Sequence, residues 1–256
     1  MSLQNNIKIK NLLEAWRPGY VATSAWLKEM GISRQLTRRY QQSGWIEAIG
    51  TGAYKRPKEL LQWYGAVASL QSQLSLDIHV GGPTAFSLRG ASHYLRLGKE
   101  RIFLFSSLNE KLPKWFSEFD WDHPVRHVKT SILPKDLGVG TYEDSGIVLK
   151  VSSLERAILE CLYISPKEFD LLECYQMLEG RQTLRPDIMQ RLLVACSSVR
   201  VKRLFLYMAD KANLPVMQYL DMEKIDLGSG DRSIVKNGVY NARFKISIPK
   251  ELADYV

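Results

Sequence analysis

The chain has few cysteines and no long uncharged hydrophobic run. Its three cysteines, Cys161, Cys174 and Cys196, are odd in number and widely spaced, so we expect no disulfide framework and a reducing compartment, the cytoplasm. No stretch approaches the roughly 18 apolar residues of a membrane span, and residues 1–10 lack the apolar core of a signal peptide. We therefore expect no membrane partner.

Acidic residues are scarce in the first quarter of the chain. Residues 1–60 contain ten lysines and arginines but four acidic residues, a net charge of +6, whereas the other 196 residues have a net charge of +2. The overall content of 45% hydrophobic and 24% charged residues is that of a globular protein and excludes collagen-like, coiled-coil and disordered chains. Such a concentration of positive charge predicts a polyanion as partner of the N-terminal segment.

The N-terminal segment contains the pattern of a helix-turn-helix. Thr23 can cap a helix over residues 24–30, and Ser33 can cap another over residues 34–43. The link over residues 31–33 is three residues long and begins with glycine. A short link with glycine between two helices is typical of a helix-turn-helix.

The outer face of the helix over residues 34–43 is rich in arginine and glutamine. Leu36 and Tyr40 lie four residues apart and can anchor the opposite face to a core. Arginine and glutamine are the side chains that bind guanine and adenine edges bidentately, and the second helix of a helix-turn-helix supplies such contacts. An ordinary solvated face is the alternative. The predicted DNA-binding residues of this helix are Ser33, Arg34, Gln35, Thr37, Arg38, Arg39 and Gln41.

A hairpin is predicted directly after this helix. Residues 45–49 and 53–56 are short strand candidates on either side of a Gly-Thr-Gly turn, and glycine permits the positive φ that tight hairpins need. Basic residues on such a wing would contact the phosphate backbone without reading sequence. The predicted wing contacts are Gly52, Tyr54, Lys55 and Arg56.

Pro57 and a fall in charge density predict a domain border near residue 59. The predicted fold class is α+β: a winged helix-turn-helix domain over residues 1–59 and a larger mixed α/β domain over residues 60–256. In the second domain, strands are expected over residues 77–80, 102–105, 125–132, 147–151 and 239–248, and helices over residues 154–163, 169–178, 186–196 and 201–211.

No motif in the chain carries a recognisable chemistry. Residues 81–84 lack the ending of a phosphate-binding P-loop and the spacing of a dinucleotide site. The Gly-Ser-Gly turn over residues 228–230 has no following pair of carboxylates that could hold Mg²⁺. We therefore expect no catalytic residue, no metal site and no cofactor.

A group of late basic residues is the other notable feature. If the helix over residues 201–211 buries its apolar side, its cations would stand on one surface. This surface is either solvated or a binding surface for an acidic protein or a nucleic acid. Its candidate residues are Arg200, Lys202, Arg203, Arg232 and Lys236.

Several short motifs follow one another in a particular order along nearly the whole chain. They are Gly44-Trp45, Gly52-Ala53-Tyr54, Trp63-Tyr64-Gly65-Ala66, His79-Val80-Gly81-Gly82-Pro83-Thr84-Ala85, Ser152-Ser153-Leu154-Glu155-Arg156-Ala157, Val201-Lys202-Arg203-Leu204-Phe205 and Asp226-Leu227-Gly228-Ser229-Gly230. In this order the chain resembles the AbiEi antitoxin family of abortive-infection toxin–antitoxin systems.

The resemblance implies a protein with two functions. An N-terminal winged helix would bind inverted repeats in double-stranded operator DNA and repress the operon, and the C-terminal domain would counter a nucleotidyltransferase-like toxin. The family is of type IV, in which neutralisation does not require a stable toxin complex. Two alternatives stay open: a ligand-responsive transcriptional regulator without a toxin partner, and a nuclease-like C-terminal domain.

Overall fold

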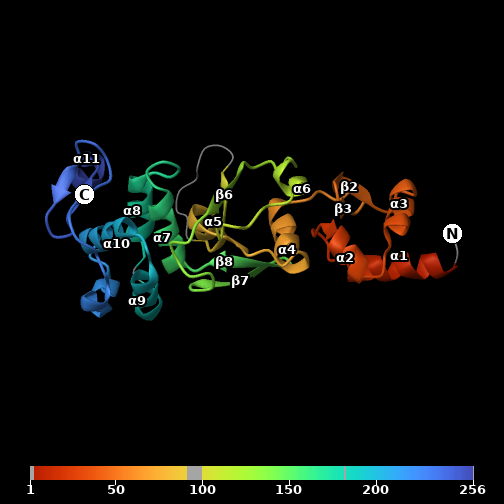
Figure 1. Ribbon diagram of the computed structural model, residues 1–256, viewed down its shortest axis with the longest axis horizontal. Helices are drawn as coiled ribbons and strands as arrows, with labels where there is room; N and C mark the ends of the chain where they lie inside the picture. Colours follow the sequence, from red (N-terminus) through yellow and green to blue (C-terminus); the bar gives the residue numbers. More distant parts are fainter. Residues whose placement is uncertain (1–2, 91–99, 182, 256) are drawn as a thin grey trace. The chain divides into compact units, whose positions relative to one another are not determined.

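The computed structural model combines helices with short strands and describes residues 3–90, 100–181 and 183–255 (Figure 1). Helices hold 43% of the residues and strands 18%, which confirms the α+β class. The N-terminal elements are α1 (Leu3–Ala15), β1 (Ala22–Thr23), α2 (Ser24–Glu29), α3 (Arg34–Gln42), β2 (Glu47–Gly50), β3 (Ala53–Lys55), α4 (Trp63–Gln73), β4 (Ile78–Val80), α5 (Gly82–Leu88), β5 (Ile102–Ser106), α6 (Lys114–Ser117), β6 (Val125–Lys129) and β7 (Val139–Asp144). They are followed by β8 (Ile147–Ser152), α7 (Leu154–Ile164), α8 (Leu171–Glu179), α9 (Pro186–Ala195), α10 (Val199–Lys211), the 3₁₀ turns η1 (Pro215–Tyr219) and η2 (Met222–Lys224), β9 (Arg232–Ser233), β10 (Val239–Asn241), β11 (Ile246–Ile248) and α11 (Lys250–Asp254).

The described strands form three sheets, with the strand orders β1-β3-β2, β6-β5-β4-β8-β7 and β10-β11-β9. The chain divides into two units of internal contacts. The first comprises Met1–His79, Gly98–His127 and Thr141–Lys150, and the second comprises Val80–Leu97, Val128–Gly140 and Val151–Val256. Strands β4 and β8 thus begin in the first unit and end in the second. The border near residue 59 is not a boundary of these units and stays a prediction.

The first unit contains the hairpin and the two helices α2 and α3 expected from the sequence, and α1 precedes them. Trp16 directly after α1, Leu27 of α2 and Tyr40 of α3 are each at most 1% exposed and belong to the core around these helices. Strand β3 pairs antiparallel with both β1 and β2, which closes a three-stranded sheet beside the helices. This arrangement of helices and sheet is a winged helix-turn-helix.

Helix α4 supplies polar side chains that satisfy the backbone of residues 19–23. Ser69 Oγ accepts a hydrogen bond from Val21 N at 2.9 Å. Gln73 Oε1 accepts one from Thr23 N, and its Nε2 donates to Val21 O. Gly65 lies against the Gly19 carbonyl so closely that a Cβ there would be 2.0 Å from the oxygen. Because buried backbone groups need partners, α4 is part of the packing of the winged helix.

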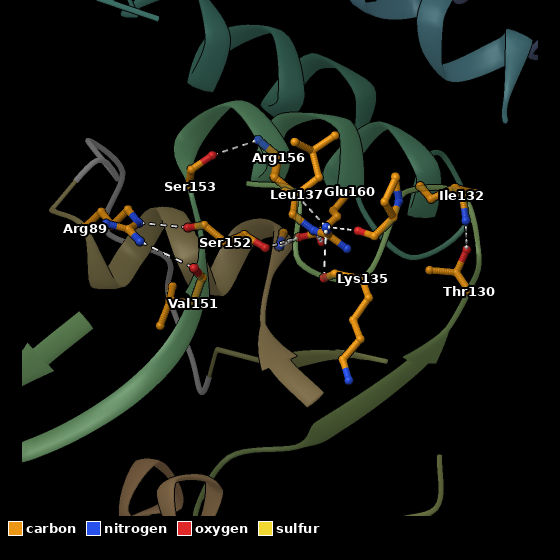
Figure 2. A network of polar contacts seen from close by, with 12 residues as sticks. Arg89, Thr130, Ile132, Lys135, Leu137, Val151, Ser152, Ser153, Arg156 and Glu160 are labelled. Atoms are coloured by element: carbon orange, nitrogen blue, oxygen red, sulfur yellow. Dashed lines mark hydrogen bonds and ion pairs between the residues drawn. The ribbon is translucent and has the colours of Figure 1, made fainter. Parts of the chain in front are cut away.

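A buried ion pair joins several elements of the second unit (Figure 2). Arg156 and Glu160 of α7 have side chains that are 5% and 1% exposed, and Arg156 Nε donates to Glu160 Oε1 at 2.7 Å. The other carboxylate oxygen accepts hydrogen bonds from Gly82 N and Ser152 Oγ. Arg156 Nη1 also donates to the carbonyl of Leu137. One pair therefore joins α7 to the start of α5, the end of β8 and the segment before β7.

A second buried arginine holds the C-terminal sheet. Arg203 of α10 is 2% exposed, and its guanidinium donates to the carbonyls of Leu227, Gly228, Gly230 and Lys245 at 2.7–3.2 Å. Helix α10 also contacts α7 and α8 (Figure 1) and β11. The guanidinium thereby fixes the Gly-Ser-Gly turn and the chain just before β11 against α10.

One expectation about local structure was wrong, and one strand was not expected. The segment over residues 239–248 is a hairpin of β10 and β11 rather than one strand, because Lys245 has a φ of +51° and the Asn241 side chain accepts from Phe244 N. Strand β7 has largely exposed side chains, so its sequence carried no hydrophobic signal.

In the part of the chain that the structure describes, no helix combines the length and the apolarity that crossing a membrane requires.

We predict that Arg203→Met lowers the free energy of unfolding by about 3 kcal/mol or more, because it leaves several buried carbonyls without a donor. Urea denaturation followed by circular dichroism measures this loss. The matched control is Arg232→Met at an exposed position, for which we expect a change within about 0.5 kcal/mol. Equal small effects of the two substitutions would contradict the role of Arg203.

A pH-dependent contribution is predicted for Glu155, which is 3% exposed and accepts hydrogen bonds from Arg185 Nε and Nη2 at 3.0 and 2.9 Å. Burial alone would raise the pKa of Glu155, but the bonds from Arg185 outweigh it and lower the pKa from 4.5 to about 2. Because the folded pKa is the lower one, the stabilisation is complete above pH 4.5 and is lost as the pH falls toward 2.

We therefore expect the wild type to exceed Glu155→Gln in unfolding free energy by a constant amount above about pH 5. The difference should shrink toward zero as the pH falls to 2, the folded pKa of Glu155. Denaturant titrations across this pH range measure it, with Glu118→Gln at an exposed position as control. A difference that persists undiminished at the lowest pH would rule out this assignment.

Candidate nucleic-acid interface

Two side-chain caps position the helix-turn-helix as expected. Thr23 Oγ1 accepts from Trp26 N at 3.2 Å and starts α2, and Ser33 Oγ accepts from Leu36 N at 3.3 Å and starts α3. Gly31 follows α2 with a φ of +73°, the left-handed conformation that glycine adopts at no steric cost. The chain therefore turns within three residues, and Leu36 and Tyr40 pack α3 onto the core.

The opposite face of α3 is exposed and polar. In the described structure, the side chains of Arg34, Arg38 and Arg39 form no hydrogen bond or ion pair within the chain. The exposed residues predicted from the sequence are Ser33, Arg34, Gln35, Arg38, Arg39 and Gln41. Their side chains present donors and acceptors of the kind that bind base edges and phosphates.

Gln42 belongs to the same face and was not among the predicted residues. It is exposed and lies four residues after Arg38, so Arg34, Arg38 and Gln42 follow one another along the helix surface. The spacing in the sequence could have identified it. Arg38 lies in the middle of this row.

Thr37 does not lie on the exposed face, which corrects the expectation for this residue. It is 6% exposed, and its Oγ1 donates to Ser33 O at 3.0 Å. A threonine hydroxyl inside a helix commonly bonds to the carbonyl four residues before it. Thr37 therefore supports the first turn of α3 and is not available to a base.

The wing pairs as a tight hairpin, but its basic residues already have partners. Lys55 Nζ lies 3.0 Å from Glu47 Oε2 and 3.0 Å from Glu59 O, and the hydrogen bond from Lys55 lowers the pKa of Glu47. Arg56 donates to the carbonyls of Leu13 and Trp16. Arg56 therefore holds the end of α1, and it would have to leave these carbonyls to reach DNA.

The other two predicted wing residues lie in the hairpin itself. Gly52 at the tip has a φ of +80°, and its carbonyl accepts from Ser24 N at 2.8 Å. Tyr54 in β3 is half-buried and pairs with Ala22 and Ala48. Gly50 of β2 approaches Trp115 of α6, where an added Cβ would be 2.7 Å from the tryptophan Cβ. The hairpin therefore contacts α6 next to its turn.

The late basic residues do not form the single surface that was expected. Lys202 is 3% exposed, Arg203 is 2% exposed, and Arg200 donates to the carbonyls of Ser165 and Tyr163. Helix α10 packs against α7 and α8 and the C-terminal sheet at once, so almost none of its surface remains free. Arg232 and Lys236, which lie in and after β9, are exposed.

Among the residues that the structure describes, no three histidine, cysteine, aspartate or glutamate side chains gather where they could hold a metal ion.

Comparisons with known proteins cover nearly the whole chain. Residues 5–97 match the family model "Transcriptional regulator, AbiEi antitoxin N-terminal domain", and residues 99–249 match "Transcriptional regulator, AbiEi antitoxin, Type IV TA system". No curated protein matches.

A solved structure, the RV2827C protein from Mycobacterium tuberculosis, is similar with a TM-score of 0.58. The alignment covers 96% of this chain and 92% of that one at 14% identity, so the likeness concerns the fold alone. The N-terminal family model covers the winged helix-turn-helix and α4, and the other model covers most of the chain after them. The chain therefore belongs to the AbiEi antitoxin family, the transcriptional regulators of type IV toxin–antitoxin systems.

Proposed function

We propose that the chain represses its own operon by binding inverted repeats in operator DNA through α3, and that its C-terminal part counters a nucleotidyltransferase-like toxin. The observation that carries the first half is the capped helix α3 with a row of exposed arginine and glutamine side chains. Family membership supports a regulatory and an antitoxin role in general.

The proposed DNA contacts are divided by their chemistry. Arg34, Gln35, Arg38 and Gln42 would bind base edges in the major groove from α3. Arg39 and Gln41 lie beside this row and would bind phosphates. Thr37 and Arg56 are left out of the proposed interface because both already serve as internal hydrogen-bond donors.

The proposed antitoxin surface contains fewer residues than the sequence indicated. Arg232 and Lys236 are the exposed members of the late basic group, and the turn before Arg232 is held in place by Arg203. Exposed cations on a rigid frame favour encounter with an acidic partner surface more than they add affinity. This suits neutralisation without a stable complex.

Arg38→Ala is expected to weaken binding to the DNA upstream of the gene by about 1–3 kcal/mol and to relax preference at one base pair. Fluorescence anisotropy with operator and random duplexes measures both effects. Binding by the wild type should also fall steeply with salt, since phosphate contacts release counterions.

The control is Arg191→Ala, which removes an exposed arginine from α9 in the second unit. It should leave operator affinity unchanged. If Arg38→Ala and Arg191→Ala bind operator DNA equally well, or if Arg38→Ala loses affinity for operator and random DNA alike, α3 is not the reading helix.

Reversing Arg232 and Lys236 to glutamate is expected to abolish rescue of growth when the neighbouring toxin gene is induced, while repression of a reporter from the upstream DNA persists. Arg38→Ala should do the opposite. The physical reason is that α3 and the exposed cations of the second unit belong to different units of the chain.

The matched control reverses Arg191 and Lys250, also one exposed arginine and one exposed lysine of the second unit. It should keep both rescue and repression. Loss of rescue by both double reversals would show a general charge effect, and unchanged rescue by the Arg232 and Lys236 reversal would refute this surface.

A further inference from the structure

A cavity of about 410 Å³ lies within the first unit and has no part in the proposed DNA contacts. The end of α1, helix α2, helix α4 and the strands β7 and β8 all contribute to its walls. Pockets that hold small molecules have volumes of roughly 300–1,000 Å³. The size of this cavity is therefore that of a small-molecule site.

One wall of the cavity is aromatic. The rings of Trp16 and Trp26 lie 6.2 Å apart at an interplanar angle of 59°, and Tyr20 is beside them. Trp16 Nε1 donates to Tyr20 O at 2.8 Å, which fixes the Trp16 ring, whereas Trp26 is half-exposed. A planar ring of a ligand can pack against this wall, because aromatic pairs are stabilised in tilted and offset arrangements.

The charged groups at the cavity all have one sign. Arg17 and Lys150 line it and are exposed, and neither side chain has a hydrogen-bond or ion-pair partner among the described residues. Of the described residues that line the cavity, none carries a carboxylate. Lys150 shares one face of β8 with Val148, another lining residue, because alternate residues of a strand point the same way. The charge complementarity therefore favours an anion.

The walls are held in place before any ligand binds. Gln71 Nε2 donates to Ile78 O and Lys150 O, and its Oε1 accepts from Lys150 N at 2.8 Å. Tyr20 Oη accepts from Val148 N at 3.1 Å. These bonds fix α4 and the segment after α1 to β8. A preformed cavity binds a ligand without the cost of ordering its own walls.

We propose that this cavity is a binding site for a small aromatic anion. The ring would pack on Trp26 and Tyr20, and the anionic group would lie between Arg17 and Lys150. Such a site goes beyond DNA binding and toxin neutralisation, and it is measured without DNA or toxin.

The experiment is a fluorescence titration of the full-length chain with 8-anilinonaphthalene-1-sulfonate, an aromatic anion. N-phenyl-1-naphthylamine, the same ring system without the sulfonate, is the matched neutral probe. Saturable binding of one sulfonate probe per chain is expected. Lys150→Glu and Arg17→Glu should each weaken it by about tenfold, because an attractive charge becomes a repulsive one.

Lys111→Glu, an exposed lysine of the same unit outside the cavity, makes the same charge change and should leave binding within about twofold. The neutral probe should bind Lys150→Glu and the wild type equally. The proposal is overturned if the sulfonate probe does not saturate, if Lys150→Glu and Lys111→Glu behave alike, or if the neutral probe responds to Lys150→Glu as the anion does. Circular dichroism of each variant establishes that it is folded.

Discussion

The buried pair of Arg156 and Glu160 is the interaction on which most of the second unit depends. A carboxylate and a guanidinium that are buried away from water need hydrogen-bond partners from the protein for all of their own donors and acceptors. Glu160 does so with Gly82 N and the Ser152 hydroxyl, and Arg156 with carbonyls before β7. The pair thereby specifies where α5 begins, where β8 ends and how both meet α7. Replacing either residue alone would leave the other charge buried and unpaired.

The same rule explains which cationic side chains of the protein are available to bind a partner. Arg203 and Arg200 donate to backbone carbonyls in the second unit, and Arg56 does so in the first. These side chains hold loops and helix ends in place, so their donors are already bound to carbonyls inside the protein. The arginines of α3 have no such internal partner in the described structure. The distinction between a structural and a binding arginine therefore follows from its partners rather than from its position in a basic cluster.

The winged helix depends on more than its own residues. Val21 and Thr23 donate to side chains of α4, and Tyr20 accepts from Val148 of β8. These contacts fix the chain just before the cap of α2, and α2 in turn supports α3. The same contacts enclose the cavity beside Trp26. A ligand there would thus lie against the first helix of the DNA-binding motif.

Local signals in the sequence determined the helix-turn-helix, its two caps, the hairpin and most of the helices of the second unit, because caps, glycine turns and apolar spacing act within a few residues. The family motifs also lie in the sequence itself. The burial of Thr37, Lys202 and Arg203 was decided by the tertiary structure alone. Each is polar and resembles a surface residue in the sequence. For Arg203, the carbonyls that allow its burial come from segments 24 to 42 residues away. The cavity likewise exists only where α1, α2, α4 and β8 meet, since no one of these segments encodes a concave surface.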